Sequence, residues 1–136
     1  MASQIELSIV TPDARLASVT VDELRAPGAV GSFGVRPGHT PFLTRMEPGE
    51  LWYRQGTTTA SVAVSSGFIE VDRDRVSVLA EEALPADKID VEAARKALAE
   101  AQAKMKGMNT AEPAFAVEQA RARWAQARLL VAGSKG

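Results

Sequence analysis

The spacing of the apolar residues changes once along this chain of 136 residues, close to Glu81. Before that point apolar and polar residues alternate over short segments, as they do over residues 5–9, which is typical of half-buried β-strands. After it, apolar residues recur every three or four positions, which is typical of amphipathic helices. The change predicts a mainly β protein with an α-helical tail, divided into a β domain over residues 1–85 and a helical domain over residues 86–136.

Turn residues divide the β domain into short segments. Prolines, glycines and the run Asp72-Arg73-Asp74 interrupt the alternating pattern every several residues, which favours a sandwich or barrel-like pair of sheets with about eight to ten strands. The expected strands cover residues 5–9, 16–24, around 30, 33–35, 42–46, 51–54, 57–64, 67–71 and 75–80, with turns at Pro12-Asp13, Pro27-Gly28, Pro48-Gly49 and Gln55-Gly56.

Two helices are predicted for the tail. Asp87 or Asp90 can cap the first helix after a break at Pro85. Gly107 suits the end of that helix, and Pro113 suits the first turn of the next one. The two apolar faces consist of Ala94, Leu98, Ala101 and Met105, and of Val117, Ala120, Trp124, Ala127 and Val131. These faces predict an antiparallel hairpin, and its alanine-rich seam gains only modest burial, so that the hairpin can open.

Charge is distributed unevenly along the chain, although its net charge is only −1. Residues 1–85 hold 11 acidic and 7 basic residues, a net of −4, whereas residues 86–136 hold 6 acidic and 9 basic residues, a net of +3. No acid follows Arg121. Two interpretations stay open: a solvated helix face whose cations suit the helix dipole, or a tail that docks on an acidic partner. Nucleic acid is not expected as a partner, because the basic residues form no dense run.

Few side chains in this sequence suit catalysis or metal binding. The chain has no cysteine and a single histidine, His39, so it cannot build a His/Cys zinc site. It also has no phosphate-binding loop, dinucleotide-binding fingerprint or nucleophile elbow. Glu81 and Glu82 are adjacent residues at a strand end, where neighbouring side chains point apart. We therefore predict no catalytic residue, no metal site and no cofactor.

The densest group of turn-forming residues is the stretch Gly31-Ser-Phe-Gly-Val-Arg-Pro-Gly-His-Thr-Pro41. Its three glycines and two prolines predict a loop with a sharply defined path. The histidine of this loop, His39, either fixes the loop by hydrogen bonding across it or contacts a partner surface.

This stretch closely resembles the corresponding block of the epsilon subunit of F-type ATP synthases. The likeness continues through Leu43-Thr44, Pro48-Gly49, Ser66–Val71, Val76–Ala80 and Ile89-Asp90. The resemblance implies a ten-stranded flattened β-sandwich followed by an antiparallel two-helix hairpin. It also implies a non-catalytic subunit of the central stalk, or rotor. In this family the subunit joins the gamma subunit to the membrane c ring and couples proton transport to ATP synthesis by rotation.

The resemblance further implies which residues meet other subunits. The set expected to face the c ring or the gamma subunit is Ser32, Phe33, Arg36 and His39. Many family members carry an acidic residue at the position of Ser32, so Arg36 could supply the polar contact here instead. In the family an extended hairpin reaches the alpha and beta subunits and impedes ATP hydrolysis. The hairpin residues expected to make these contacts are Arg121, Arg123 and Arg128.

Some bacterial members of the family bind ATP between sandwich and hairpin through an Ile/Leu-Asp-x-x-Arg-Ala motif. Ile89 and Asp90 match the start of this motif, but its arginine position holds Ala93. Arg95 lies two residues further on, about 200° around the helix, and faces elsewhere. We therefore predict weak or no ATP binding.

The resemblance places the protein at the cytoplasmic face of a bacterial inner membrane, attached peripherally through the complex. The sequence contains no apolar run of the roughly 20 residues that span a bilayer, and its start does not have the composition of a transit peptide. Two other classes of protein are alternatives. One is a β-sandwich module that binds a small ligand, and the other is a small hydrolase that uses Glu81 or Glu82.

Overall fold

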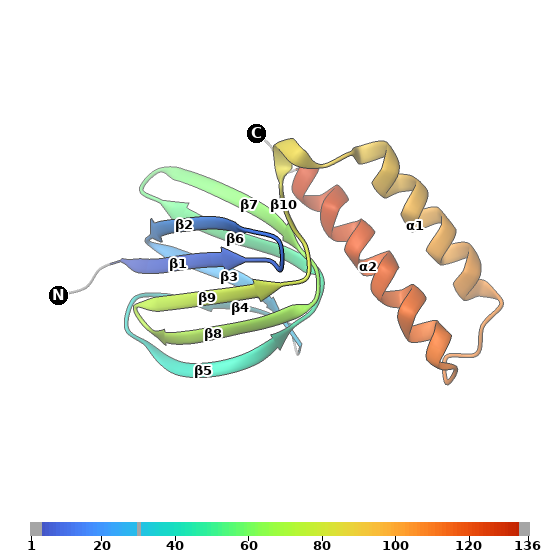
Figure 1. Ribbon diagram of the computed structural model, residues 1–136, viewed down its shortest axis with the longest axis horizontal. Helices are drawn as coiled ribbons and strands as arrows, with labels where there is room; N and C mark the ends of the chain where they lie inside the picture. Colours follow the sequence, from blue (N-terminus) through green and yellow to red (C-terminus); the bar gives the residue numbers. More distant parts are fainter. Residues whose placement is uncertain (1–3, 30, 134–136) are drawn as a thin grey trace.

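The computed structural model describes residues 4–29 and 31–133, whose strands form two packed layers with a pair of helices beside them (Figure 1). The first layer has the strand order β5-β8-β9-β1-β2, and the second has the order β4-β3-β6-β7-β10. The predicted fold class, a β-sandwich of ten strands with two C-terminal helices, is confirmed. The strands are β1 (Ile5–Val10), β2 (Arg15–Val21), β3 (Glu23–Gly28), β4 (Gly31–Val35), β5 (His39–Met46), β6 (Gly49–Gln55), β7 (Thr58–Val64), β8 (Gly67–Arg73), β9 (Arg75–Ala80) and β10 (Ala83–Pro85).

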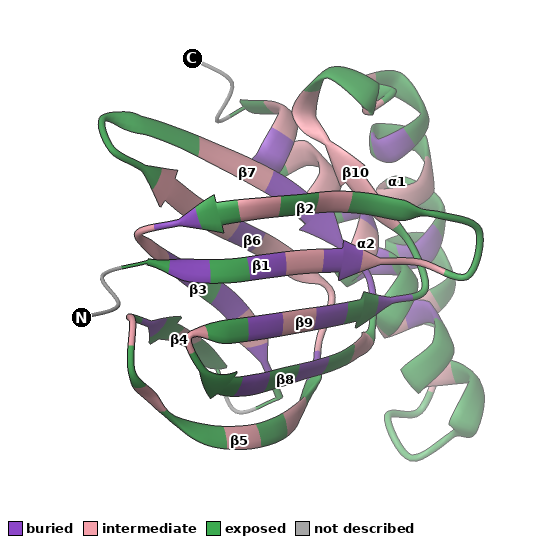
Figure 2. Ribbon diagram, turned by 60° about the vertical axis from the view of Figure 1, so that its left-hand side comes forward, coloured by how far each residue is buried: buried purple, intermediate pink, exposed green. Residues whose placement is uncertain are grey.

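The hydrophobic core lies between the two layers and takes alternate residues from their strands (Figure 2). β1 shows the principle, because Ile5, Leu7 and Ile9 are buried while the residues between them are more exposed. This alternation is the direct result of the two-residue side-chain period of a strand. The largest fully buried side chains of the core are Ile5, Leu7, Ile9, Leu24, Met46, Leu51 and Ile69.

One predicted strand proves to be two. We expected a single strand over residues 16–24, whereas β2 ends at Val21 and β3 begins at Glu23. Asp22 lies between them, where the chain passes from the first layer to the second: Val21 pairs with Ile5, and Glu23 pairs with Arg54. The backbone N–H of Asp22 donates to the carbonyl of Arg54 at 2.7 Å, so the crossing residue is itself fixed.

One predicted turn, Pro27-Gly28, and one predicted break, at Pro85, lie within strands, whereas Pro48-Gly49 is at the turn between β5 and β6 as predicted. Pro27 and Gly28 belong to β3 and Gly49 to β6, and the carbonyl of Pro27 accepts from the N–H of Glu47 at 2.9 Å. A proline is tolerated there because the bond uses its carbonyl and not the N–H that it lacks. Pro85 closes the short strand β10, which pairs with β7 and which the sequence pattern did not predict.

The tail contains a short 3-10 helix η1 (Ala86–Lys88) and two α-helices, α1 (Val91–Lys106) and α2 (Pro113–Gly133). Asp90 caps α1, since its side chain accepts from the N–H of Ala93 at 3.0 Å. Gly107 is the C-cap of α1, and Pro113 is the first residue of α2, as predicted. α2 contacts β6, β7 and α1, so it lies between the second layer and α1.

The predicted apolar face of α2 is only partly correct. Trp124 is half-buried and Ala127 and Val131 are buried, but Val117 and Ala120 are exposed. The buried residues of α2 are Glu118, Ala122, Ala125, Ala127 and Val131. A single stripe fails here because α2 packs against two surfaces at once. Ala127 and Val131 meet Ala63 of β7, whereas the N-terminal part of the helix extends past the sandwich with α1 (Figure 1).

Candidate functional site

The loop expected to meet other subunits joins β4 to β5 and contains a cluster of three rings. The rings of Phe33 and Phe42 meet edge to face with their centroids 5.2 Å apart, and the His39 ring lies 5.2 Å from the Phe42 ring. Phe33 and Phe42 also pack against the core between the layers. The cluster ties the loop to the rigid part of the sandwich, since aromatic pairs of this geometry add to the burial of the rings.

The hydrogen bond across this loop comes from the backbone and not from His39. The N–H of Gly38 donates to Oδ1 of Asp74, in the turn between β8 and β9, at 2.7 Å. Gly38 has a φ of 77°, in the left-handed region that glycine adopts without strain. His39 bonds only to its neighbour in the described structure, with Nδ1 2.8 Å from the carbonyl oxygen of Thr40. His39 therefore contributes ring packing to the loop.

Ser32 and Arg36 are both exposed, but they lie at opposite ends of β4: Ser32 is within the strand, opposite Pro27, and Arg36 follows its last residue. Nε of Arg36 lies 3.7 Å from Oε2 of Glu23, and Nε of Arg54 donates to the other carboxylate oxygen, Oε1, at 3.2 Å. Arg54 in turn contacts Asp22 at 3.4 Å. The chain of charges holds Arg36 near the sandwich but leaves its guanidinium largely in solvent.

Asp22 anchors this chain of charges. Its carboxylate accepts from the N–H of Gly56, at the β6–β7 turn, with a separation of 2.5 Å. This hydrogen bond, with smaller contributions from Gln4 and Arg54, holds the pKa of Asp22 below its ordinary value. The carboxylate is thus kept charged, and the loop between β6 and β7 stays tied to the crossing between β2 and β3.

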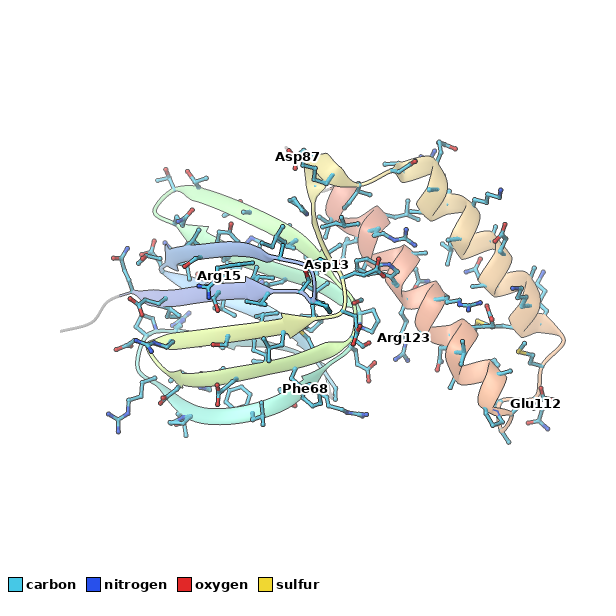
Figure 3. The ribbon with its side chains drawn as sticks, in the orientation of Figure 1. Asp13, Arg15, Phe68, Asp87, Glu112 and Arg123 are labelled. Carbon is cyan, nitrogen blue, oxygen red and sulfur yellow. The ribbon has the colours of Figure 1, made fainter. Side chains whose placement is uncertain are left out.

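An apolar patch on the outer face of the first layer was not predicted. Its members are Leu43 of β5, Phe68 of β8 and Leu79 of β9, whose exposed fractions are 66%, 50% and 54%. Phe68 is directly opposite Leu79 in the β8–β9 ladder, and Figure 3 shows it on the outer side of the layer. We call these three residues the outer patch. Exposed apolar side chains gathered on one face are typical of a protein-binding surface.

The outer patch left a weak signal in the sequence. Phe68 and Ile69 are adjacent apolar residues in a strand, so one of them must point away from the core. The three members come from strands far apart in the chain, and only the pairing of β5 with β8 and of β8 with β9 brings them together.

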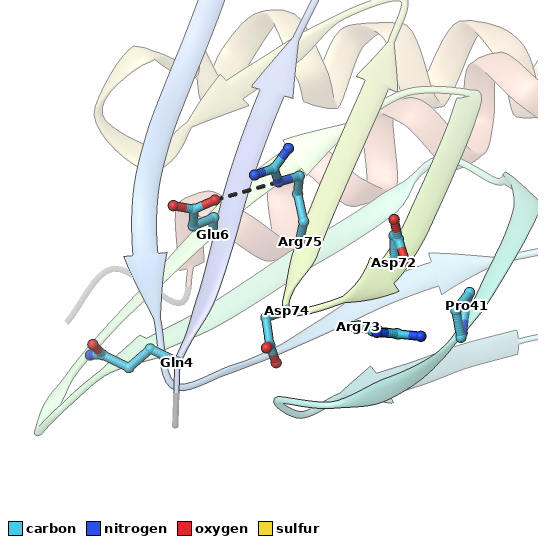
Figure 4. Close-up of a pocket in the computed structure, with 7 residues that line it drawn as sticks. All are labelled: Gln4, Glu6, Pro41, Asp72, Arg73, Asp74 and Arg75. Carbon is cyan, nitrogen blue, oxygen red and sulfur yellow. Dashed lines mark ion pairs between the residues drawn. The ribbon is translucent and has the colours of Figure 1, made fainter. Parts of the chain in front are cut away.

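One hollow lies at the β8–β9 turn, with a volume of about 720 Å³ (Figure 4). It is lined mainly by charged residues, some of which bond within the protein. Glu6 pairs with Arg75 at 3.4 Å, and Asp74 accepts the N–H of Gly38. Nothing in the lining singles out a ligand.

The residues considered for chemistry lie apart from one another. Glu81 and Glu82 are both exposed, after the end of β9. Their backbone N–H groups bond to the carbonyl of Ser66 at 3.1 Å and to Oγ of Ser65 at 2.8 Å. Among residues 4–29 and 31–133, no three histidine or acidic side chains come together as metal ligands would. In the same residues, neither helix combines the length and the apolar character that a membrane crossing requires.

The three hairpin arginines each have a partner within the chain. Arg121 contacts Glu118 at 3.0 Å, and the guanidinium of Arg128 lies 5.1 Å from the Trp124 ring. Arg123 reaches the sandwich, where it lies 3.7 Å from a carboxylate oxygen of Glu47. Figure 3 shows Arg123 on the side of α2 that faces the strands.

The residues of the nucleotide motif have structural roles. Ile89 packs against the small apolar cluster of Ala63, Ala127 and Val131, and Asp90 uses its carboxylate to cap α1. Arg95 forms an ion pair with Glu92, on the exposed side of α1.

The fold and these surfaces define a class of protein: a β-sandwich with a docked helix hairpin and an outward apolar patch. The family model described as "ATP synthase, Delta/Epsilon chain, beta-sandwich domain" matches residues 4–86. The chain belongs to the family of ATP synthase epsilon chains.

Similar proteins extend over the whole chain. The ATP synthase epsilon chain of Myxococcus xanthus (strain DK1622) is 49% identical over 127 residues, which cover 93% of each chain. The ATP synthase epsilon chain 2 of Syntrophotalea carbinolica (strain DSM 2380 / NBRC 103641 / GraBd1) is 43% identical over 136 residues, which cover 100% of this chain and 99% of that one.

Two solved structures also resemble this chain. One is a chain in the cryo-EM structure of the Euglena gracilis mitochondrial ATP synthase, titled OSCP/F1/c-ring in rotational state 1. It has a TM-score of 0.81 and 26% identity and covers 98% of this chain and 82% of that one. The other belongs to the central stalk/c-ring of the Tetrahymena thermophila mitochondrial ATP synthase. At 14% identity, with a TM-score of 0.64 and coverage of 94% and 96%, it shows the shared fold alone.

Proposed function

We propose that this protein is a rotor subunit that links the gamma subunit of its ATP synthase to the membrane c ring and couples proton transport to ATP synthesis. The observation that carries the proposal is the outer patch, an uncovered apolar surface on a chain of this family. The hairpin contacts the second layer, so the patch on the first layer stays free for another subunit. The similarity to a chain of the Euglena gracilis F1/c-ring assembly supports the same assignment.

Two surfaces have different partners in this proposal. The outer patch binds the gamma subunit, and the segment at residues 31–41, with the exposed residues Ser32 and Arg36, faces the polar loops of the c ring. Ring packing around Phe42 and the bond from Gly38 to Asp74 stiffen the loop, which suits a joint that transmits torque. The chain itself carries out no catalysis. It lies at the cytoplasmic face of a bacterial inner membrane and attaches peripherally through the complex.

Co-purification from the native organism tests the proposal. The tagged protein should bring the gamma subunit and the c ring with it, in amounts that survive mild detergent. Recovery of the tagged chain alone would overturn the rotor role. The alternative function, a β-sandwich module that binds a small ligand, would then be favoured.

We also propose that the hairpin inhibits ATP hydrolysis by reaching the alpha and beta subunits. Two features support this role: the arginines of α2, Arg121, Arg123 and Arg128, and the small apolar contact of the hairpin, which loses little when the hairpin undocks. Deleting residues 87–136 should raise the ATP hydrolysis rate of the reconstituted enzyme about twofold or more, without lowering ATP synthesis. An unchanged hydrolysis rate would show that the hairpin does not inhibit in this enzyme.

ATP should bind weakly or not at all to the isolated protein. The arginine position of the motif holds Ala93, and Asp90 is engaged as a helix cap. We expect calorimetry to give a dissociation constant above about 1 mM, equivalent to less than about 4 kcal/mol of binding free energy. The Ala93→Arg variant is the matched comparison. A sub-millimolar constant for the unmodified chain would contradict the prediction.

A further inference from the structure

The hairpin is held on the sandwich by a small apolar contact and one ion pair. The apolar contact consists of Ala63, Ala127 and Val131, with Ala86, Ile89 and Trp124 around them. In residues 4–29 and 31–133, Arg123–Glu47 is the single ion pair that joins α2 to the strands. Because the apolar contact contains mostly small side chains, one polar contact is a sizeable part of what holds the hairpin.

The ion pair lies at the boundary of the docked part of α2. Ala127 and Val131, one and two turns further along the helix, are buried against the sandwich. On the other side of Arg123, Ala120 and Val117 are exposed, and Val117 keeps 51% of its surface. The chain connects to the sandwich through η1, next to the end of α2, so the loop at residues 107–112 is the free end of the hairpin (Figure 1). A force on that free end reaches Arg123 before it reaches the apolar contact.

The acidic partner is rigidly placed. The N–H of Glu47 donates to the carbonyl of Pro27, and the N–H of Ala29 donates to the carbonyl of Arg45 at 3.1 Å, which ties the β5–β6 turn to the β3–β4 turn. Glu47 and Arg123 line one groove together with Ser32 and Leu130. Glu50 lines the same groove but accepts the hydroxyl of Ser61 at 2.6 Å. Glu47 is thus the acid placed to receive Arg123.

We propose that Arg123 and Glu47 form an electrostatic latch, the first contact to break when the hairpin leaves the sandwich. The pair is partly exposed, at 47% for Arg123 and 36% for Glu47, so salt weakens it. The groove beside the latch also contains Ser32, from the segment proposed to face the ring. The contact that releases the hairpin and the segment proposed to face the c ring therefore border the same groove. The biological role of the latch rests on the proposed function. The experiment that tests the latch uses the isolated chain and does not depend on that function.

The absence of cysteine from the sequence makes the latch measurable in the isolated chain. Ala63 is buried under α2, so the labelling rate of an Ala63→Cys variant with a thiol reagent reports the undocked fraction. Ala26 is buried between the layers, so Ala26→Cys reports unfolding of the sandwich. We expect Arg123→Glu or Glu47→Arg to raise labelling at position 63 by about two- to fivefold, the range for an exposed ion pair. Labelling at position 26 should not change.

Two controls separate the latch from a general charge effect. The double variant that swaps the charges, with Arg123→Glu and Glu47→Arg, should restore the slow labelling. Arg95→Glu makes the same charge change on the exposed side of α1 and should have no effect. In about 1 M salt, where the screening length is about 3 Å, the difference between the variants should largely disappear.

Unchanged labelling in both single variants, or a double variant that labels as fast as they do, would overturn the latch. The latch would also be overturned if position 63 is labelled no faster than position 26 in every variant. The hairpin would then leave the sandwich only when the sandwich itself unfolds. Failure of the rotor role would be seen instead as a lack of co-purifying subunits and would not alter these rates.

Discussion

Replacing Gly67 by alanine should destabilise the sandwich by about 3 kcal/mol or more, the largest effect expected from adding a single methyl group to this chain. A Cβ at this position would lie 1.9 Å from the carbonyl oxygen of Leu79 and 2.9 Å from Cα of Ala80. Both atoms belong to the backbone of β9, which pairs with Gly67 directly, so no side-chain rotation can relieve the clash. The strands would have to separate at the start of β8.

Thermal unfolding followed by circular dichroism measures this effect. A loss of about 3 kcal/mol lowers the melting temperature of a domain of this size by about 10 °C or more. Gly107→Ala is the matched control, because a Cβ there would have no heavy atom within 4 Å and its φ is −93°. The control should change stability by less than about 0.5 kcal/mol. Equal melting temperatures for the two variants would show that β8 and β9 are not in this close contact.

Those parts of the fold that depend on local sequence were predictable. The two-residue period of β1 and the three- or four-residue period of α1 gave the correct type of element, and Asp90, Gly107 and Pro113 marked helix ends. Each of these features acts within a few residues, so a single sequence is enough to recognise it.

The features that could not be predicted from the sequence depend on which distant segments of the chain contact one another. The break at Asp22 shows in the sequence only as a one-residue shift in the alternation between Val21 and Leu24, whereas the change from pairing with β1 to pairing with β6 depends on the fold. In α2 the buried set includes Glu118, only 7% exposed, since one side of the helix faces α1 and another faces the strands. A prediction that assumes one apolar face along a helix cannot identify two separate buried faces.

The candidate site shows the same division. Gly31–Pro41 stood out in the sequence because its glycines and prolines are local signals, and the structure adds how Phe33, Phe42 and Asp74 hold the loop. The outer patch and the pair of Arg123 with Glu47 depend on contacts between distant segments, and the only local sign of either is the adjacent apolar pair Phe68-Ile69. Surfaces that bind partners are therefore the part of this protein for which the structure adds most.

Introducing a charge into the outer patch should abolish most of the binding to the gamma subunit. Phe68→Asp places a carboxylate opposite Leu79, in a surface that the proposed contact would remove from water. Loss of a central aromatic residue from an interface costs about 2 kcal/mol or more, which corresponds to at least about a 30-fold weaker complex. Because Phe68 is half-exposed in the free chain, the fold itself should lose much less.

A binding measurement with the purified gamma subunit, such as surface plasmon resonance, checks this prediction. Val117→Asp is the matched control. It adds the same charge at a similarly exposed apolar residue, but on the N-terminal part of α2, which extends past the sandwich. Its affinity should stay within about threefold of the unmodified chain, a change of less than about 0.7 kcal/mol. If Phe68→Asp binds as tightly as the control does, the gamma subunit does not use the outer patch. The sandwich would then have to engage the rotor through the loop at residues 31–41 alone.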